Sequence, residues 1–485
     1  MTTNTELDAR SSIRWLWRQL TSMRTALILL LLLGVAAIPG SLFPQRSQNP
    51  LKVSDYFKSN PGTAKFLDQL HIFDVYSSPW FSSIYILLFI SLIGCVLPRS
   101  FEHLKGIGAQ PSLTPKNLNR MEFHTEVADG TLDGAEAWLR KNRFRIRRDT
   151  NSISAEKGFM RETGNLLFHL SLILILVGVA LGSLYGMKGD AIINVGERFI
   201  NTPTSYDVIS YGKLQSGKNL IPFSITATDF KATYELGTGV PSDYKLAVNV
   251  SNPVGTKEEA RIVKVNSPLT FGATKVYLQA NGYSPLVTVR DKAGEIKYQG
   301  AVIFLPQDGN LTSSGAIKVP DMNPQVGFVG SFVPTYSRSS ARGAFSTYPE
   351  VLDPRLLISI WTGDLGLDSG TPQSIYRVNT TDMKQIGLKT LKLHETHNFG
   401  DGSITFEGWT PWVNLQIVKD PGKMYALLGS IFAILGLLMS LFTRSRRIWV
   451  KENQNKSGVE IAGLAKNSAP GLENEIASLV SKVKG

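Results

Sequence analysis

Cysteine is almost absent from this sequence, because Cys95 is the only one among 485 residues. A single thiol cannot form an intramolecular disulfide, and it excludes CxxC redox chemistry, a cysteine-rich zinc site and covalent haem attachment through CxxCH. The sequence also has no GxSxG, Walker or HExxH motif, so no common enzyme class is indicated. Any chemistry must therefore depend on a few individually placed residues.

Charged side chains are absent from four windows of 18 or 19 residues, although they make up 19% of the chain. About 20 apolar residues in a helix cross the hydrocarbon core of a bilayer. We therefore exclude an ordinary soluble protein and predict transmembrane helices at 25–43, 80–97, 164–184 and 424–442. The arginines before the first helix would also suit a signal peptide, but Pro39 and the lack of an Ala-x-Ala cleavage site favour a retained helix.

Basic residues outnumber acidic ones by 51 to 39, and the surplus is unevenly placed. Lys and Arg number four in 1–24, twelve in 98–163 and eight in 443–485, but only four in 44–79. The positive-inside rule therefore predicts a multi-pass cell-membrane protein in which 1–24, 98–163 and 443–485 are cytoplasmic. The loop 44–79 and the segment 185–423 are then extracytoplasmic. Membrane topology and contact with anionic lipid explain the surplus, so no nucleic-acid partner is expected.

The segment 185–423 is too long for a loop, and its pattern predicts a large all-β domain. Short alternating or β-branched runs recur between turn signals, which favours a sandwich or a barrel-like sheet. A hairpin turn is expected at 291–294, and the Gly, Ser and Asn content of 307–343 suggests a long irregular excursion. The predicted strands are 223–228, 244–250, 261–265, 275–280, 286–290, 295–305 and 356–361.

The cytoplasmic segment 98–163 has the pattern of a small α+β unit of the βαβ type. Its predicted elements are strands at 122–127, 144–148 and 152–156 and a helix at 132–141. In the cytoplasmic tail 443–485, an amphipathic helix is expected at 472–483, as a surface or lipid-facing segment.

His169 is the only histidine inside the apolar windows, which contain no Asp, Glu, Lys or Arg, and it lies about one turn from the predicted cytoplasmic end of the third helix. An imidazole in a membrane must be hydrogen-bonded, face water or bind a ligand. Two interpretations follow from its placement. It either hydrogen-bonds a neighbouring helix or serves as an axial ligand to haem iron or another metal, for which neutral imidazole is well suited.

The remaining histidines and the cysteine give weaker signals. His394 and His397 form an HxxH pair, and one helical turn would bring both onto a metal ion. The flanking residues 391–393 instead have the pattern of a strand, in which an offset of three places two side chains on opposite faces. A metal site there is the less favoured interpretation. We interpret the others as exposed polar residues or, for the cysteine, as a packing residue: His71, His103, His124 and Cys95.

The residues 155–171, with the sequence AEKGFMRETGNLLFHLS, resemble the start of the third membrane helix of the ResB family, which comprises System II cytochrome c biogenesis proteins. Further resemblances to this family occur in the same order along most of the chain. They lie at 23–25, 44–45, 78–81, 94–95, Arg99, 243–244, 265–269, Gly272, 277–279, 420–422 and 446–450.

The resemblance implies a role in attaching haem to apocytochrome c outside the membrane. Proteins of this family pair with a ResC-type partner, also called CcsA, whose tryptophan-rich motif handles haem. This chain has no comparable tryptophan-rich loop, so it is expected to be a non-catalytic or co-catalytic subunit of a haem lyase complex. The family's intramembrane histidine corresponds to His169, which favours its interpretation as an axial ligand to haem b, carried transiently as substrate.

Haem has a flat apolar ring and two carboxylates, so a cleft between helices would shelter the ring while basic groups hold the propionates. Arg161 lies two helical turns before His169 and is a candidate propionate contact, as is Lys157. Both residues could equally be basic residues that flank the cytoplasmic end of a membrane helix and bind no ligand. The β-rich domain is expected to dock the partner, the apocytochrome or both. It contains no cysteine, so thiol reduction would require another protein, such as a membrane-tethered thioredoxin-like one.

Two other classes compete with this interpretation. One is a membrane-anchored extracytoplasmic ligand- or protein-binding module, in which His169 is structural and haem has no role. The other is a small transporter subunit, which is disfavoured because only one of the four apolar windows contains an ionisable residue. A neighbouring gene for a tryptophan-rich partner would distinguish these classes.

Overall fold

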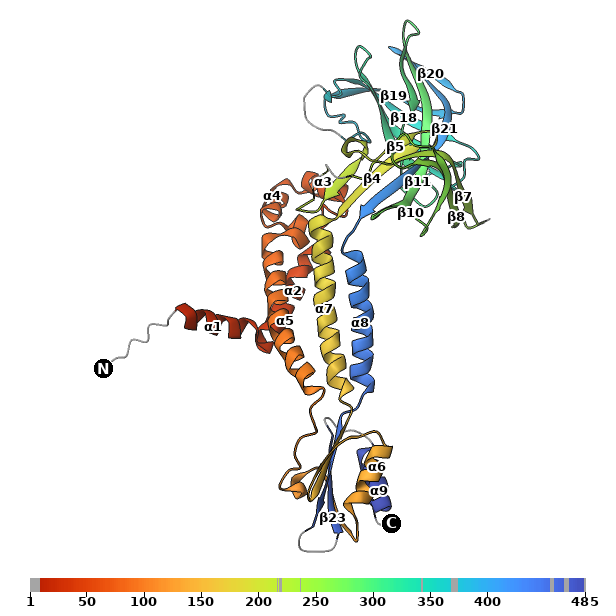
Figure 1. Cartoon of the computed structure of the whole chain (residues 1–485). Helices are drawn as coiled ribbons and strands as arrows, with labels where there is room; N and C mark the ends of the chain where they lie inside the picture. Colours follow the sequence, from red (N-terminus) through yellow and green to blue (C-terminus); the bar gives the residue numbers. More distant parts are fainter. Residues whose placement is uncertain are drawn as a thin grey trace, which may run out of the picture. The chain divides into compact units, whose positions relative to one another are not determined.

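The computed structural model describes residues 9–215, 217, 220–235, 237–341, 343–367, 374–453, 458–465 and 471–483. The chain forms two compact units (Figure 1). The first comprises Met1–Ala180 and Gly422–Gly485, and the second comprises Leu181–Pro421. We name the first the membrane unit and the second the β unit.

Four long apolar helices confirm the predicted membrane spans. They are α2 (Met23–Leu42), α5 (Pro79–Gly106), α7 (Met160–Tyr185) and α8 (Lys423–Phe442). Serine caps begin two of them, because Ser22 Oγ accepts the backbone N–H of Thr25 and Ser78 Oγ accepts that of Phe81. These bonds satisfy donors that a first turn leaves unpaired. A short helix, α1 (Ala9–Leu20), precedes α2.

The segment 44–79, predicted only as a loop, contains α3 (Pro50–Ser59), α4 (Pro61–Gln69) and the 3-10 helix η1 (Ile72–Ser77). Gln45 fixes this segment from inside. Its amide nitrogen donates to the carbonyls of Phe43 and Ile72, and its oxygen accepts the N–H of Val75. Ion pairs from one arginine, Arg46, to Asp68 and Asp74 lie at the surface of the same segment.

The residues around α6 (Leu132–Lys141) form a small α/β subdomain together with the C-terminal tail. Its antiparallel sheet has the order β1–β23–β22–β3–β2. The short 3-10 helix η2 (Leu118–Arg120) precedes it. The strands are β1 (Phe123–Ala128), β2 (Arg145–Asp149), β3 (Ser152–Lys157), β22 (Arg446–Glu452) and β23 (Gly458–Ala465).

The predicted elements of this segment are all present, as β1, α6, β2 and β3. They do not form a βαβ unit by themselves, because two strands from the tail lie between β1 and β3. One interpretation of the tail was wrong. The predicted amphipathic helix is present as α9 (Leu472–Val483), but it is not a lipid-facing segment. Its apolar side is buried beside α6 against one face of the sheet (Figure 1), because an amphipathic helix is stabilised by burying that side against an apolar surface. The buried residues of α9 are Leu472, Ile476, Leu479 and Val483.

In the part that the structure describes, the β unit consists of strands and loops with the 3-10 turn η3 (Pro203–Ser205) and no α-helix, which confirms the predicted class. A seven-stranded sheet has the order β10–β11–β21–β4–β6, with β12 and β20 paired to its two long strands. A second sheet has the order β5–β7–β8–β9, a third the order β13–β14–β15–β18–β19, and β16 pairs with β17. The strands are β4 (Met187–Asn194), β5 (Arg198–Ile200), β6 (Val208–Tyr211), β7 (Ser224–Tyr234), β8 (Pro241–Ser251), β9 (Glu259–Lys264), β10 (Leu269–Phe271), β11 (Thr274–Asp291), β12 (Ile296–Ala301), β13 (Leu305–Pro306), β14 (Ser313–Val319), β15 (Val326–Val333), β16 (Tyr336–Ser339), β17 (Gly343–Ser346), β18 (Arg355–Gly363), β19 (Met383–Lys392), β20 (Thr396–Phe399) and β21 (Gly402–Lys419).

The long strands β11 and β21 form a ribbon that is shared by two apolar cores. One end, near Val276 and Leu415, packs on the sheet of β7 and β8. The other end, near Val287 and Phe406, packs on the sheet of β15 and β18. Between them Trp412 covers Gly282, where a Cβ atom would lie 2.5 Å from the indole ring. The β unit is therefore two sandwiches joined by one ribbon.

Three details of the β unit differ from the sequence-based expectations. The separate strands predicted at 275–280 and 286–290 are one continuous strand, β11. The segment 307–343 is not irregular, because it contains β14, β15 and β16. Most of the Gly and Ser residues that suggested a loop lie inside these strands instead. The hairpin turn at 291–294 is confirmed between β11 and β12.

Candidate functional site

His169 lies in the third turn of α7, where its own helix orients the ring. Its Nδ1 is 2.7 Å from the carbonyl oxygen of Asn165, one turn earlier. A carbonyl only accepts hydrogen bonds, so Nδ1 carries the proton and donates it. In the neutral imidazole, the lone pair is then on Nε2, and this atom has no hydrogen bond to any residue that the structure describes.

α7 and α8 pack closely through glycines on a face other than that of His169. A Cβ atom on Gly164 would lie 2.6 Å from the backbone nitrogen of Ser440, and one on Gly436 would lie 2.6 Å from that of Phe168. At 3.6 residues per turn, His169 is rotated about 140° from Gly164 around α7. The half-buried imidazole therefore does not point at α8.

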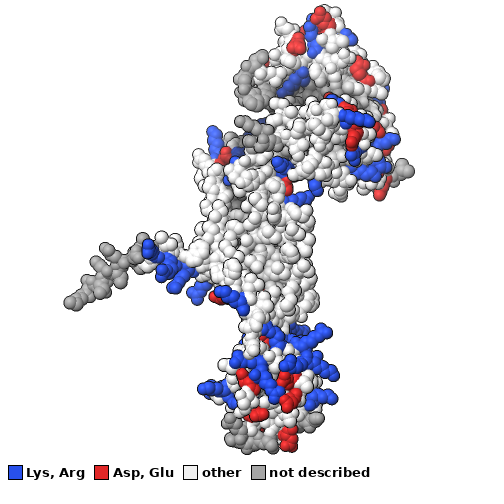
Figure 2. All heavy atoms as spheres, in the orientation of Figure 1, with Lys and Arg blue, Asp and Glu red and all other residues white. Residues whose placement is uncertain are grey.

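A cavity of about 730 Å³ lies at the beginning of α7, between the helices and the α/β subdomain. Asn165, whose carbonyl holds the His169 ring, is part of its wall. Four basic side chains and two carboxylates also line it. They are Arg99, Lys157, Arg161, Arg447, Glu156 and Glu162. Figure 2 shows Lys and Arg gathered at this end of the helices, next to a helix surface without charge.

The structure places both predicted propionate contacts, Arg161 and Lys157, on the wall of this cavity. α7 extends back through Arg161, which lies about 12 Å before His169 along the helix axis at 1.5 Å per residue. The sequence analysis did not select Arg99 or Arg447 for this site. Arg99 belongs to α5 and pairs with Glu162 at 3.3 Å, and Arg447 is the second residue of β22. Sequence order gives no signal that these distant residues meet here.

The other histidines have local structural contacts. His103 and His124, expected to be exposed, are half-buried: His103 bonds the hydroxyl of Thr163 and stacks on Phe159, and His124 pairs with Glu460. His394 occupies a turn with φ of 61°, and His397 lies in β20. Within the described ranges, no group of three or more His, Cys, Asp or Glu side chains is placed to hold a metal ion.

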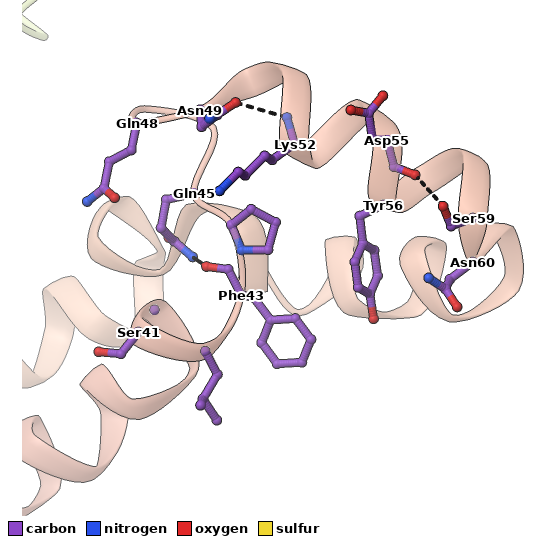
Figure 3. Close-up of a pocket in the computed structure, with 13 residues that line it drawn as sticks. Ser41, Phe43, Gln45, Gln48, Asn49, Lys52, Asp55, Tyr56, Ser59 and Asn60 are labelled. Atoms are coloured by element: carbon purple, nitrogen blue, oxygen red, sulfur yellow. Dashed lines mark hydrogen bonds between the residues drawn. The ribbon is translucent and has the colours of Figure 1, made fainter. Parts of the chain in front are cut away.

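A second cavity, of about 760 Å³, lies between the end of α2 and α3 (Figure 3). Its wall is mostly uncharged and polar, with Lys52 and Asp55 as its charged members. Gln45 lines it but already uses both amide atoms on backbone groups, as Figure 3 shows for the bond to Phe43. The sequence analysis predicted no site here, and the arrangement carries no evident chemistry. The residues 44–45 instead have a structural role.

The β unit buries polar side chains without a catalytic arrangement. Asn194 accepts a hydrogen bond from Ser284 and donates to Glu197. Burial raises the pKa of Tyr234 to about 12 and raises that of Tyr283 as well, whose hydroxyl donates to the carbonyl of Pro349. These groups stay neutral at physiological pH and contribute to packing.

Comparison with known proteins adds independent information. The model of the ResB-like family matches residues 23–477. Similar curated proteins include "Cytochrome c biogenesis protein CcsB" of Synechococcus sp. (strain WH7803), 24% identical over 474 residues and covering 96% of each chain. The protein of the same name from Prochlorococcus marinus (strain NATL2A) is 24% identical, covering 95% of this chain and 97% of the relative. That of Synechococcus sp. (strain JA-3-3Ab) is 26% identical, with coverages of 96% and 89%.

Proposed function

Since the chain belongs to the ResB-like family, we propose that it is a membrane subunit of System II cytochrome c biogenesis. In this proposal it takes part in moving haem b across the membrane and supports its covalent attachment to apocytochrome c. The names of its CcsB relatives support the general role. The proposal includes the orientation predicted by the basic residues, with the α/β subdomain in the cytoplasm and the β unit outside.

The hydrogen bond between His169 Nδ1 and the carbonyl of Asn165 is the single observation that carries the haem proposal. Histidines that ligate metals usually donate their second ring N–H to a carbonyl or carboxylate, which fixes the ring and its ligating lone pair. His169 has this arrangement, because Nδ1 is bound to the Asn165 carbonyl and the lone pair is on Nε2. Neutral imidazole nitrogen is a common axial ligand to haem iron. The residues present therefore fit haem iron as a transient substrate.

The basic wall of the cavity fits the propionates. Carboxylates are held best by guanidinium groups, which offer paired donors. Arg99, Arg161 and Arg447 supply such groups next to the same turn of α7 that carries Asn165, and Lys157 adds a fourth positive charge. The carboxylates of Glu156 and Glu162 engage part of this charge, so a propionate would exchange partners with them.

The site needs a partner to be complete. His169 is only half-buried, and the described membrane helices expose most of their apolar surface. Lipid covers such surface in part, but a polar imidazole is stabilised by a second protein that closes a haem pocket against it. A CcsA-type protein with a tryptophan-rich motif fits this role. In the proposed complex, this chain orients haem and contributes no catalytic residue.

The experiment is co-expression of the chain with its CcsA-type partner and a reporter cytochrome c. We expect His169→Ala to abolish covalent haem on the reporter and to remove haem absorption from the purified complex, while both proteins still accumulate. His103→Ala is the matched control, because it also removes a half-buried imidazole from this end of the helices. It is expected to leave the haem content of the complex near wild type.

Two further tests separate ligation from hydrogen bonding. Added imidazole should partly restore the Ala variant, because it can occupy the vacated space and the open iron position. His169→Gln should remain inactive if ligation is the role, but it should retain much function if the residue only hydrogen-bonds. Normal cytochrome maturation in His169→Ala at the wild-type protein level would refute the proposal.

A further inference from the structure

The short helix α1 exposes an unusual set of side chains for a protein surface. Ile13, Leu16 and Trp17 are 68%, 60% and 50% exposed. Exposed apolar groups in a contiguous patch usually mark an interaction surface. At 3.6 residues per turn, these three and Leu20 lie within an arc of about 100° on one side of the helix.

Three arginines lie beside this apolar side. Arg10, Arg14 and Arg18 recur at every fourth position and occupy an adjoining arc of about 80°. None of the three has an ion pair or a side-chain hydrogen bond within the part of the chain that the structure describes. The arginines of the α/β subdomain differ, because Arg140 and Arg148 pair with Glu136. Basic side chains flanking an apolar face are typical of helices that lie in a membrane surface.

The attachment of α1 to α5 fixes its depth. Ser91 Oγ donates to the carbonyl of Leu20 at 2.6 Å, and Trp17 and Thr21 pack against Gly94. Gly94 lies five residues before Arg99, the first charged residue after the apolar part of α5, which is about 7.5 Å along the helix. Interfacial helices bury their apolar side about 5–10 Å into the boundary of headgroups and acyl chains. α1 therefore lies at the depth that such a helix needs.

The direction of α1 is also that of an interfacial helix. Figure 1 shows α1 running crosswise to α2 and away from the bundle, instead of continuing α2 along its axis. The break at Thr21 and Ser22 produces this change, because Ser22 caps a new helix. Arginine side chains on such a helix can extend toward the headgroups while their stems remain in apolar surroundings.

We propose that α1 is an in-plane membrane helix that binds anionic phospholipid headgroups through Arg10, Arg14 and Arg18. Its apolar side lies among the acyl chains of the leaflet on the α/β-subdomain side. The ligand is a phospholipid surface because the helix combines a broad apolar side, tryptophan and unpaired positive charge at one depth. Each arginine is expected to increase the preference for anionic lipid about fivefold at low salt.

The test uses the full chain in nanodiscs of phosphatidylcholine alone or with 30% phosphatidylglycerol. With Cys95→Ser as background, spin labels are placed at Leu16→Cys on the apolar side and at Ser11→Cys on the polar side. We expect the Leu16 label to be accessible to oxygen, which dissolves in lipid, and the Ser11 label to a water-soluble nickel complex. If both labels are equally accessible to the nickel complex in both nanodiscs, the helix is in water and the proposal is wrong.

The proposed contribution of the three arginines to lipid binding is tested with spin-labelled phosphatidylglycerol. Changing Arg10, Arg14 and Arg18 to Gln should lower the relative association of this lipid over phosphatidylcholine by about 100-fold at low salt, and by less at high salt. A matched triple variant removes three exposed arginines of the β unit, Arg261, Arg290 and Arg338, and should leave the preference unchanged. An unchanged preference in the α1 variant would overturn the proposal.

Discussion

The imidazole of His169 is oriented by the backbone of its own helix, and this feature was only partly predictable. Sequence alone located a histidine in an apolar window and limited it to hydrogen bonding or ligation. The structure adds that Nδ1 is bound to the carbonyl of Asn165. The arginines from α5 and β22 were not predictable for this site, because their approach depends on packing between distant segments.

One prediction for a single residue concerns Tyr234, which is buried and packs near Tyr348. Burial raises its pKa from 10 to about 12. Between pH 10 and 12 the folded state therefore keeps a proton that the unfolded state loses. The free energy of unfolding decreases as the pH rises through this range. Stability is complete below pH 10 and is expected to fall between pH 10 and 12, by at most about 1.4 kcal/mol per pH unit for this proton.

Denaturant unfolding of the β unit from pH 8 to 12 measures this effect. Tyr234→Phe should show a shallower alkaline loss of stability than wild type, because the phenylalanine cannot ionise. Tyr277→Phe on β11 is the control at a half-exposed position. Equal slopes for wild type and Tyr234→Phe would show that this hydroxyl does not contribute.

α7 and α8 pack closely because glycines, which have no side chain, lie at their contact. An added Cβ at Gly164 would lie 2.6–2.7 Å from backbone atoms of α8, and backbone cannot rotate away. We expect Gly164→Ala to destabilise the protein by about 1–3 kcal/mol through overpacking. Gly34→Ala in α2 is the matched control, because nothing lies within 4 Å of its added Cβ. Thermal unfolding in detergent compares them.

Intrinsic propensity alone predicts the opposite trend for Gly164. Alanine is favoured over glycine inside a helix by about 1 kcal/mol, so a non-packed position should become more stable. Gly34→Ala is expected to follow this rule, whereas Gly164→Ala is not. If both variants melt together, α7 and α8 do not pack as described.

For the C-terminal tail, the sequence could predict the strands and the helix but not the segments against which they pack. The basic residues after α8 were used only for topology, yet Arg446–Glu452 is a central strand whose Ile448 and Val450 are buried. Together with Trp449 they form a short apolar run between charged residues, and this run was a usable strand signal. The partner strands were not predictable, because β3 and β22 are separated by two membrane helices and the whole β unit. The amphipathic pattern of α9 was predictable, but the surface that covers it was not.

At the scale of the whole molecule, the division into two compact units predicts that the β unit folds alone. Its two apolar cores are built only from its own strands. Residues 185–423 expressed as a fragment should therefore give a β-rich circular dichroism spectrum and a cooperative unfolding transition. We expect this fragment to purify without haem, since the proposed ligand is in the membrane unit.

An absorption spectrum of the purified fragment provides the check. A Soret band that disappears when His394 or His397 is changed would place the haem site in the β unit and contradict the assignment to His169. A fragment that is unfolded when expressed alone would show that the β unit depends on the membrane unit for its folding.

The last prediction concerns the side of the membrane on which the β unit and the α/β subdomain lie. The structure shows which positions are exposed enough for cysteine labelling. Sequence alone suggested Ser251 as an external labelling site and Ser152 and Ser457 as internal ones. Ser251 is only 3% exposed and bonds to Ser224, so it would not react in any topology. Ser457 lies outside the described residues, and Ser152 is half-buried in β3. Exposed positions are available instead at Thr256 in the β unit and Asn151 in the α/β subdomain.

In a Cys95→Ser background, Thr256→Cys should react with an impermeant thiol reagent in intact cells, whereas Asn151→Cys should react only after permeabilisation. The physical reason is the retention of Lys- and Arg-rich segments on the cytoplasmic side. The predicted topology has four crossings, which put both ends and the α/β subdomain on one side, so one probe there tests the prediction for all three. Labelling of Asn151→Cys in intact cells would invert the orientation and would require haem to enter the basic cavity from outside.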